Sequence, residues 1–365
     1  MSRTIRIDRE LKNFDAARVP IKSSERVSGD VPYLGASGEV DRVEGFTHEG
    51  DFLCVSEDGE NLRSRNTPIA WVQRGKFWAN NHVHILGGLP LARLKFYEAA
   101  LAVAPISSYI TGSAQPKLSQ AALSSVLVPK FCPADQEAVG QVLGAFDDKI
   151  AANRRLVSVA DDSIRAHVSA RLAEPSRLWG AVDFVFGEAF KGDSFSAPGT
   201  GRALVRIRDL KSQKCQVWTT ERRSKELEVR PGDLLVGMDA EFRATRWSGP
   251  TGVLNQRVLA ASSDKYGPAI AREMLVAPLR RIERSKSGTT VIHLNKSDLL
   301  DEGVLIPVDS EVSALRALVD PMWDRAVAAE QESVRLAATR DELLPLLMSG
   351  KITVKDAEKT VEEVV

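Results

Sequence analysis

The sequence predicts an α+β protein: two mixed α/β globular domains in tandem, each followed by a long helix, the two helices packing as an antiparallel coiled-coil spacer. Three observations lead to this prediction. The chain repeats itself at an offset of about half its length, each copy contains short apolar runs between Gly and Asp clusters, and each copy ends in a stretch with helical spacing of apolar residues. At 365 residues, the chain is long enough for two or three domains with apolar cores of their own.

The repeat rests on three matches that keep the same order along the chain. Gly50–Leu53 matches Gly232–Leu235, which lies half a chain length later. Residues 118–129 match residues 294–307, and each of these segments ends in a proline. A third match, at nearly the same offset, falls inside the two predicted helices. Because order and offset are both nearly kept, we interpret the chain as two copies of one unit, a globular domain followed by a helix.

This interpretation divides the chain into four segments. The first globular domain is predicted at residues 1–128 and its spacer helix at residues 129–172. The second globular domain is predicted at residues 173–306, and the second spacer helix with its tail at residues 307–365. At 1.5 Å per residue, a helix of about 35 to 40 residues would form a rigid spacer about 55 Å long.

Each predicted helix carries one narrow apolar stripe. In the first helix the stripe consists of Val139, Leu143, Phe146, Ile150, Val157 and Ala160. In the second helix it consists of Val312, Leu315, Val319, Met322, Ala326 and Val334. Such a stripe can pack on its own globular domain or on a partner helix, and the repeat favours pairing of the two helices. Pro321 predicts a kink or a restart within the second helix.

The termini and the cysteines bear on the compartment. Residues 1–12 alternate charges instead of forming an apolar leader, and no stretch approaches the roughly 18 apolar residues that a membrane span needs. Cys54, Cys132 and Cys215 are widely separated, which argues against a thiolate zinc site and fits a reducing compartment. We therefore expect a soluble, cytoplasmic protein without a membrane partner.

Charge is balanced overall but is distributed unevenly. The chain has 49 Lys and Arg against 49 Asp and Glu, so its total charge gives no reason to expect a nucleic-acid partner. Residues 201–257 contain 12 basic and 7 acidic side chains, a net charge of +5, whereas residues 341–365 have a net charge of −3. This segregation suits contact with phosphates in the second globular region.

Two sets of polar side chains suit the reading of base edges in DNA, because amide and cationic groups pair with the donors and acceptors of the major groove. In the first region the set is Ser37, Arg63, Arg65, Asn80, Asn81 and His82. In the second region the set is Arg208, Lys211, Arg243, Arg246, Asn255 and Gln256. The same side chains could instead be solvated surface groups or caps of turns, and the sequence leaves both interpretations open.

The sequence shows none of the common catalytic motifs and no familiar metal-ligand spacing. The chain contains no Gly-x-Ser-x-Gly elbow, phosphate loop, dinucleotide fingerprint or His-Glu-x-x-His helix. His82 and His84 share one strand face and His48 could add a third ligand, but no carboxylate stands at a familiar ligand spacing, so we expect no metal site. The adjacent acids Glu57 and Asp58, with these histidines, leave a hydrolase as an alternative interpretation.

Three segments resemble one known family. Residues 111–118 look like the Gly-Ser-x-Gln-Pro-x-Leu segment that closes a target-recognition domain in the specificity subunits of type I restriction-modification systems. Residues 145–155 are similar to the Leu-Asp-x-Lys-Ile-x-x-Asn-Arg stretch of the spacer in that family, and residues 340–350 resemble its C-terminal counterpart. The resemblance also includes residues 32–38 and 50–61, so it follows the family order of recognition domain, helix, recognition domain, helix.

Two segments depart from the family pattern. Residues 22–26 replace the usual opening Gly-Lys turn, and Phe131-Cys132-Pro133 stands where such chains often carry Pro-Pro. Neither departure touches the segments that carry the resemblance.

The resemblance implies a specificity subunit with no catalytic residues of its own. Each domain would read one half of a bipartite, asymmetric site in double-stranded DNA, and the helices would set the distance between the halves. The implied partners are two methyltransferase subunits and, in the full nuclease, two motor-nuclease subunits. The assembled complex would be an adenine-N6 DNA methyltransferase and an ATP-dependent endonuclease.

The implied cofactors belong to the partners: S-adenosylmethionine, ATP and Mg²⁺ would bind there, and this chain would hold none. The helix residues that we expect to contact partners are Phe146, Ile150, Met322, Leu343 and Leu344. An alternative is a stand-alone DNA-binding adaptor of a defence system, with no role in methylation.

Overall fold

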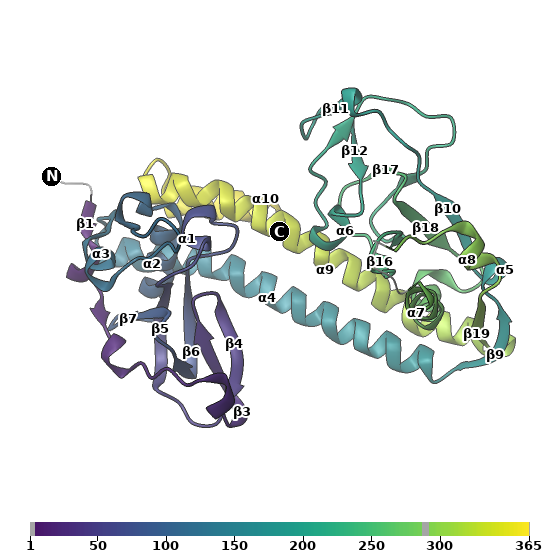
Figure 1. The fold of residues 1–365 in the computed structure, drawn as a ribbon. Helices are drawn as coiled ribbons and strands as arrows, with labels where there is room; N and C mark the ends of the chain where they lie inside the picture. Colours follow the sequence, from purple (N-terminus) through teal and green to yellow (C-terminus); the bar gives the residue numbers. More distant parts are fainter. Residues whose placement is uncertain (1–3, 287–291, 365) are drawn as a thin grey trace. The chain divides into compact units, whose positions relative to one another are not determined.

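The structure is a computed structural model that describes residues 4–286 and 292–364, and it confirms the predicted fold class (Figure 1). The chain divides into two compact units, one formed by Met1–Lys149 with Arg335–Val365 and the other by Ile150–Val334. Each unit therefore combines one globular domain with a part of both long helices. Among the described residues, no helix is long and apolar enough to cross a membrane.

The first unit is built around a six-stranded sheet with the strand order β2-β7-β5-β6-β3-β4. Its strands are β2 (Lys12–Asn13), β3 (Ser28–Gly35), β4 (Gly38–Val43), β5 (His48–Ser56), β6 (Ala70–Ala79) and β7 (Val83–Gly87). Neighbouring strands are antiparallel except β3 and β6, which are parallel. A core cluster of this sheet consists of Leu34, Cys54, Phe77, Ala79, Val83 and Ile85.

Helices and one further strand pair complete the first unit. Helix α2 (Leu91–Val103) packs against β5 and β6, and β1 (Thr4–Arg6) pairs with β8 (Leu127–Pro129) just before the first long helix. The remaining helices of this unit are α1 (Asn61–Ser64), α3 (Gln120–Ser125) and α10 (Val354–Val364).

The second unit contains a four-stranded sheet, a five-stranded sheet and one strand pair. The four-stranded sheet has the order β10-β18-β15-β16, with β10 (Asp183–Phe186), β15 (Leu234–Gly237), β16 (Ala244–Arg246) and β18 (Val258–Ser262). The five-stranded sheet has the order β11-β13-β12-β17-β14, with β11 (Phe195–Ser196), β12 (Arg202–Val205), β13 (Trp218–Thr219), β14 (Glu228–Val229) and β17 (Gly252–Leu254). The pair consists of β9 (Leu172–Arg177) and β19 (Gly303–Pro307).

Helix α7 (Gly267–Ser285) covers the four-stranded sheet of the second unit, where it contacts β16 and β18. The core beneath it includes residues of both long helices, because Ile164 and Val168 come from the first and Val319 and Trp323 from the second. The shorter helices of this unit are α5 (Leu178–Ala181), α6 (Asp209–Ser212) and α8 (Lys296–Leu300).

The strand pairing of the first unit recurs in the second. In the antiparallel ladder of β5 with β7, Ser56 pairs with Val83, and in that of β15 with β18, Gly237 pairs with Val258. The parallel pairs β3-β6 and β12-β17 also correspond. In both units a strand pair, β1-β8 or β9-β19, leads into a long helix. The repeat seen in the sequence is therefore a repeat of structure.

The two long helices, α4 (Pro133–Ser169) and α9 (Asp309–Ser349), pair within each unit. In the first unit Arg340 donates a hydrogen bond to Asp147, and in the second Asn153 Nδ2 donates to Glu332 Oε2 at 2.8 Å. The predicted stripes are buried at most positions, including Val139, Leu143, Phe146, Ile150, Val312, Leu315, Val319 and Ala326. Val334 is an exception with 39% of its surface exposed. Helix α9 continues through Pro321, so of the kink or restart expected there, the restart is absent.

Trp323 ties α9 to the second globular domain. Its ring is 1% exposed, and its Nε1 donates to the carbonyl oxygen of Gly232 at 3.0 Å. The guanidinium of Arg246 lies 4.9 Å from the ring centroid and forms ion pairs with Asp161 of α4 and Glu330 of α9, both at 2.8 Å. Burial by itself would raise the pKa of Asp161, but the hydrogen bonds and charges of the neighbouring arginines outweigh it and lower that pKa.

We expect Arg246→Ala to lower the free energy of unfolding by about 2 to 4 kcal/mol, because it takes the cation from partly buried Glu330 and leaves Asp161 with Arg272 alone. Arg243→Ala is the matched control, since Arg243 stands three positions earlier with 68% of its side chain exposed and, among the residues that the structure describes, pairs only with Glu241 at the surface. Its effect should stay within about 0.5 kcal/mol. Urea unfolding followed by tryptophan fluorescence measures both, and equal effects would contradict the internal role of Arg246.

Candidate nucleic-acid interface

In the first unit, three chain segments meet beside the strand ends. The main-chain N–H of Asn80 donates to the carbonyl oxygen of Leu34 at 3.1 Å, and that of Glu57 donates to the carbonyl oxygen of His82 at 3.0 Å. The turn after β3, the end of β5 and the turn between β6 and β7 are therefore neighbours. Ser37 is exposed in the first of these turns.

The turn between β6 and β7 divides its polar side chains between structure and surface. Asn80 is only 7% exposed, and its Oδ1 accepts a hydrogen bond at 2.7 Å from the main-chain N–H of His82. Asn81 is exposed at the tip. The side chain of His82 is 48% exposed, and its Nδ1 lies 2.6 Å from Asp58 Oδ2. Asn80 thus shapes the turn, while Asn81 and His82 present their side chains to solvent.

The second unit builds the corresponding turn between β17 and β18. The N–H of Asn255 donates to the carbonyl oxygen of Val205 at 3.0 Å, and that of Met238 donates to the carbonyl oxygen of Arg257 at 3.0 Å. These are the two main-chain contacts described for Asn80 and His82. Arg257 also lies 3.7 Å from Asp239. This pair corresponds to His82 and Asp58 in the first unit, which are closer together.

The equivalence assigns roles to the predicted residues of the second unit. Asn255 is 8% exposed and takes the structural position, whereas Gln256 is exposed at the tip. Arg208 follows Val205 by three residues, as Ser37 follows Leu34, and both are exposed. Lys211 is exposed on the short helix α6 beyond Arg208.

Sequence reasoning missed Arg257 as a member of this set. Its side chain is 49% exposed in the turn of the second unit. The signal was present in the sequence, because Asn255-Gln256-Arg257 follows Asn80-Asn81-His82 at nearly the offset of the repeat.

Arg63 and Arg65 stabilise the first domain. The guanidinium of Arg63 donates to the carbonyl oxygens of Gly112 and Ser113, which fixes the loop before α3. That of Arg65 donates to the carbonyl oxygens of Ala102 and Ala104 at 2.8 and 2.7 Å, where the last turn of α2 lacks helical partners. Their hydrogen-bonding groups are therefore used by the main chain.

Arg246 also differs from its expected place. The sequence suggested a surface contact, but its side chain is 3% exposed and directed at Asp161 and Glu330. The cause is its position at the end of β16, where both long helices cover the strand with acidic side chains. Arg243 remains on the surface, with 68% of its side chain exposed.

A buried ionic cluster lies behind the turn of the first unit. His84 is 1% exposed, and its Nδ1 lies 2.6 Å from Asp15 Oδ2. Arg18 Nη1 donates to Glu57 Oε2 at 2.7 Å. Burial would raise the pKa of Glu57, but the hydrogen bonds of Arg18 and Lys117 outweigh it and lower that pKa. The carboxylate of Glu57 is thus committed to neighbouring cations, which disfavours its use as a hydrolytic acid or base.

The remaining histidine of the candidate metal set is also internal. His48 is 5% exposed and stacks on Phe77 at 5.1 Å between ring centroids, and burial lowers its pKa. Within residues 4–286 and 292–364, no three His, Cys, Asp or Glu side chains are grouped as metal ligands.

The predicted partner contacts of the helices are mostly interior. Phe146, Ile150 and Leu343 are buried, and Met322 and Leu344 are half-buried. In the second unit Met322 instead lines an apolar groove between α4 and α9, with Val159 and Leu318 among its other lining residues. Val159 is 66% exposed and Leu318 is 39% exposed. Both were missed because they lie outside the predicted stripes.

Residues 9–158 match the family model described as "Type I restriction modification DNA specificity domain". A putative type I restriction enzyme specificity subunit of Haemophilus influenzae is 42% identical over 113 residues, which cover 31% of this chain and 29% of the relative. The EcoBI specificity subunit of Escherichia coli is 29% identical over 184 residues, which cover 49% of this chain and 39% of that protein. The matched residues thus span less than half of either relative.

The fold also matches a solved structure over nearly its full length. The crystal structure of the type I restriction-modification S subunit from M. genitalium superposes with a TM-score of 0.64 at 13% identity. The superposition covers 94% of this chain and 95% of that one. Both globular domains and both long helices therefore belong to the same fold as that structure.

The two asparagines of the first turn should respond differently to truncation. We expect Asn80→Ala to lower the free energy of unfolding by about 1 to 2 kcal/mol, because the main-chain N–H of His82 loses its acceptor in a partly buried hydrogen bond. Asn81→Ala, one position away at the exposed tip, should change it by less than about 0.5 kcal/mol. Chemical denaturation of the two variants measures the difference. A larger loss for Asn81→Ala would mean that the assignment of roles in this turn is wrong.

Proposed function

From the match of residues 9–158 to the type I restriction modification DNA specificity domain, we propose that the whole chain is the sequence-reading subunit of such a system. One observation supports the extension to the second half of the chain. The second unit repeats the contacts of the first turn, with Asn255 in the place of Asn80 and Asp239 in the place of Asp58. Two such turns in one chain suit a DNA target in two parts.

In this proposal each turn reads base edges in the major groove. Asn81 and Gln256 stand at corresponding tips, and an amide of this kind pairs with the N6 and N7 positions of adenine. The neighbouring positions differ, because His82 stands where the other unit has Arg257, and arginine pairs with O6 and N7 of guanine. Different side chains at corresponding positions favour an asymmetric target, with one sequence for each half.

The chain would position the DNA, and its partners would carry out the reactions. We propose two methyltransferase subunits that bring S-adenosylmethionine and flip an adenine out of the duplex to reach its exocyclic nitrogen. Two motor-nuclease subunits would supply ATP hydrolysis and Mg²⁺ for cleavage. The long helices would set the gap between the half-sites, and the assembly would act in the cytoplasm. The commitment of Glu57 to Arg18 supports a subunit without a reaction of its own.

Methylome sequencing tests this function. Cells that express the chain with its methyltransferase should carry a split motif of methylated adenines, which should be absent from cells without the chain. If the complex assembles but methylation does not depend on the chain, the protein is a DNA-binding adaptor instead.

Matched variants test the division of reading between the units. We expect Asn81→Ala to relax one half of the methylated motif and Gln256→Ala to relax the other, because each tip would contact its own half-site. Each should cost about 1 to 3 kcal/mol of discrimination at a base pair. Each variant is the control for the other in the same methylome experiment. One variant that alters both halves would contradict separate reading by the two units.

A further inference from the structure

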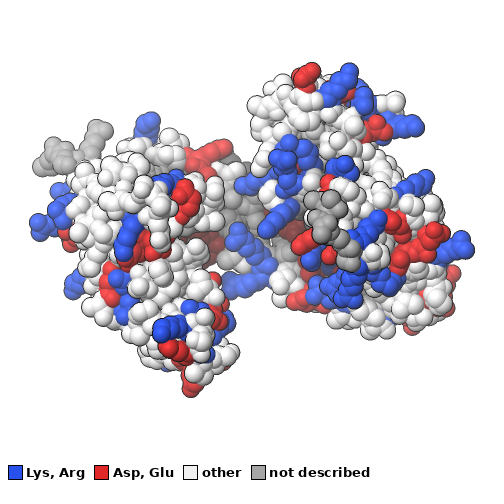
Figure 2. Space-filling model, viewed as in Figure 1, with Lys and Arg blue, Asp and Glu red and all other residues white. Residues whose placement is uncertain are grey.

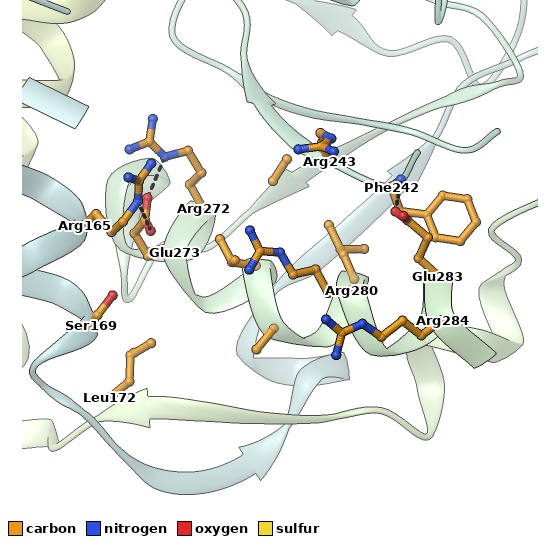
Figure 3. A pocket seen from close by; sticks show the side chains of 14 residues that line it. Arg165, Ser169, Leu172, Phe242, Arg243, Arg272, Glu273, Arg280, Glu283 and Arg284 are labelled. Carbon is orange, nitrogen blue, oxygen red and sulfur yellow. Dashed lines mark hydrogen bonds and ion pairs between the residues drawn. The ribbon is translucent and has the colours of Figure 1, made fainter. Parts of the chain in front are cut away.

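A cavity of about 790 Å³ in the second unit is lined by α7, the last turns of α4 and the segment between β15 and β16 (Figure 3). Five arginines border it, namely Arg165, Arg243, Arg272, Arg280 and Arg284. Two carboxylates border it as well, those of Glu273 and Glu283. The turns just proposed for base reading include none of these residues, so the excess of cations needs an explanation of its own.

The two carboxylates are already engaged inside the unit. The side chain of Glu273 is 5% exposed, and its Oε1 accepts a hydrogen bond from Arg272 Nε at 2.9 Å. Arg272 is committed too, since its Nη1 donates to Asp161 at 2.7 Å. Glu283 Oε2 accepts the main-chain N–H of Phe242 at 3.0 Å and so holds the segment after β15 against α7. These groups form the wall of the cavity and compensate one another.

The other arginines remain available to a ligand. Arg280 and Arg284 are exposed one helical turn apart on α7, and within the described part of the chain neither forms a hydrogen bond or an ion pair. Like charges at this spacing destabilise a helix, so their placement suits a site that an anion neutralises. The side chains of Arg165 and Arg243 are 62% and 68% exposed and, within the described ranges, pair only with acids at the surface or the cavity wall. Exchange of such exposed ion pairs for a phosphate contact costs little free energy.

The cavity is close along the chain to the turn that would read bases. Asp239 contacts Arg257 of that turn, and Arg243 at the cavity edge is four residues further on. Four residues span at most about 14 Å. The major groove of DNA is about 12 Å wide, so a side chain inside the groove lies within a similar distance of the phosphates along its edges. Figure 2 shows Lys and Arg, with some Asp and Glu among them, gathered where Figure 1 places α7.

Helix α2 of the first unit follows β7 as α7 follows β18, but it offers no such site. Its cations are paired, because Arg93 donates to Gln136 Oε1 at 2.7 Å and lies 3.2 Å from Glu10, and Lys95 Nζ lies 2.9 Å from Glu98. The free arginines of α7 therefore distinguish the second domain from the first.

We infer that the arginine-lined cavity beside α7 binds phosphates of the DNA backbone. Arg280 and Arg284 are the principal contacts, and Arg165 and Arg243 flank them. This inference rests on the proposed function for the duplex, but it assigns the second domain an anchor that is independent of base sequence. Affinity for DNA would then come unequally from the two halves of the chain.

The test compares the salt dependence of DNA binding by the full-length chain in the complex that it forms. The probes are a random-sequence duplex and a duplex with the methylated motif. Fluorescence anisotropy measures the binding of each duplex. We expect Arg280→Gln with Arg284→Gln to reduce the slope of log K against log salt by about 2, one for each lost phosphate contact. Binding of both duplexes should weaken by the same factor, and the methylated motif should be unchanged.

Two further variants make this test specific. Arg280→Lys with Arg284→Lys keeps the charge and should restore most of the slope. Arg222→Gln with Arg230→Gln is the matched control in the same unit, because these side chains are 75% and 73% exposed beside their own acids, and it should leave the slope unchanged.

Several results would overturn the phosphate site. The first is an unchanged slope. The second is a loss of binding confined to the motif duplex, which would indicate base contact. The third is a loss of complex assembly alone, which would indicate a protein partner. Failure of the proposed function looks different, since the unaltered complex would then bind both duplexes equally and methylate no motif.

Discussion

The contact between Arg246 and the two long helices is the constraint on which the second unit depends. One guanidinium holds Asp161 of α4 and Glu330 of α9, and it lies against the ring of Trp323. A buried cation with two carboxylates is stable only when all three groups keep their geometry, since any one left alone bears the full cost of desolvation. The network therefore fixes the distance between the helices where they meet the sheet. The same acid, Asp161, orients Arg272 at the wall of the cavity.

The duplicated architecture separates what must stay constant from what can vary. The main-chain contacts of Asn80 and Asn255 are the same in both units, and each turn has an aspartate beside its last residue. The side chains at the tips have no such structural role, because they are exposed and make few internal contacts. Under the proposed function, a scaffold of this kind would let one half of a DNA target change without disturbing the fold that presents the other.

Much of the fold could be predicted from the sequence, because the repeat and the helical stripes are local patterns. The tip residues Asn81 and Gln256 could be chosen from chemistry and turn propensity. The roles of Arg63, Arg65 and Arg246 could not, since each guanidinium is bound by groups distant in sequence, such as Gly112 for Arg63. A surface arginine and a buried one look alike until the fold shows which carbonyls and carboxylates lack partners. The cavity beside α7 was missed for the same reason, as α4, the β15–β16 segment and α7 meet only in the folded unit.

The division of the chain into units has a consequence for its synthesis. Residues Arg335–Val365 belong to the same compact unit as Met1–Lys149, so this unit cannot be completed until the whole of the second unit has been translated. Until then the stripe around Phe146 has no cover from α9. A stop codon just before residue 335 would therefore leave the unit of Met1–Lys149 incomplete, although the lost residues follow the second unit in sequence. Such a chain would expose its apolar stripe and would therefore be prone to aggregation or proteolysis.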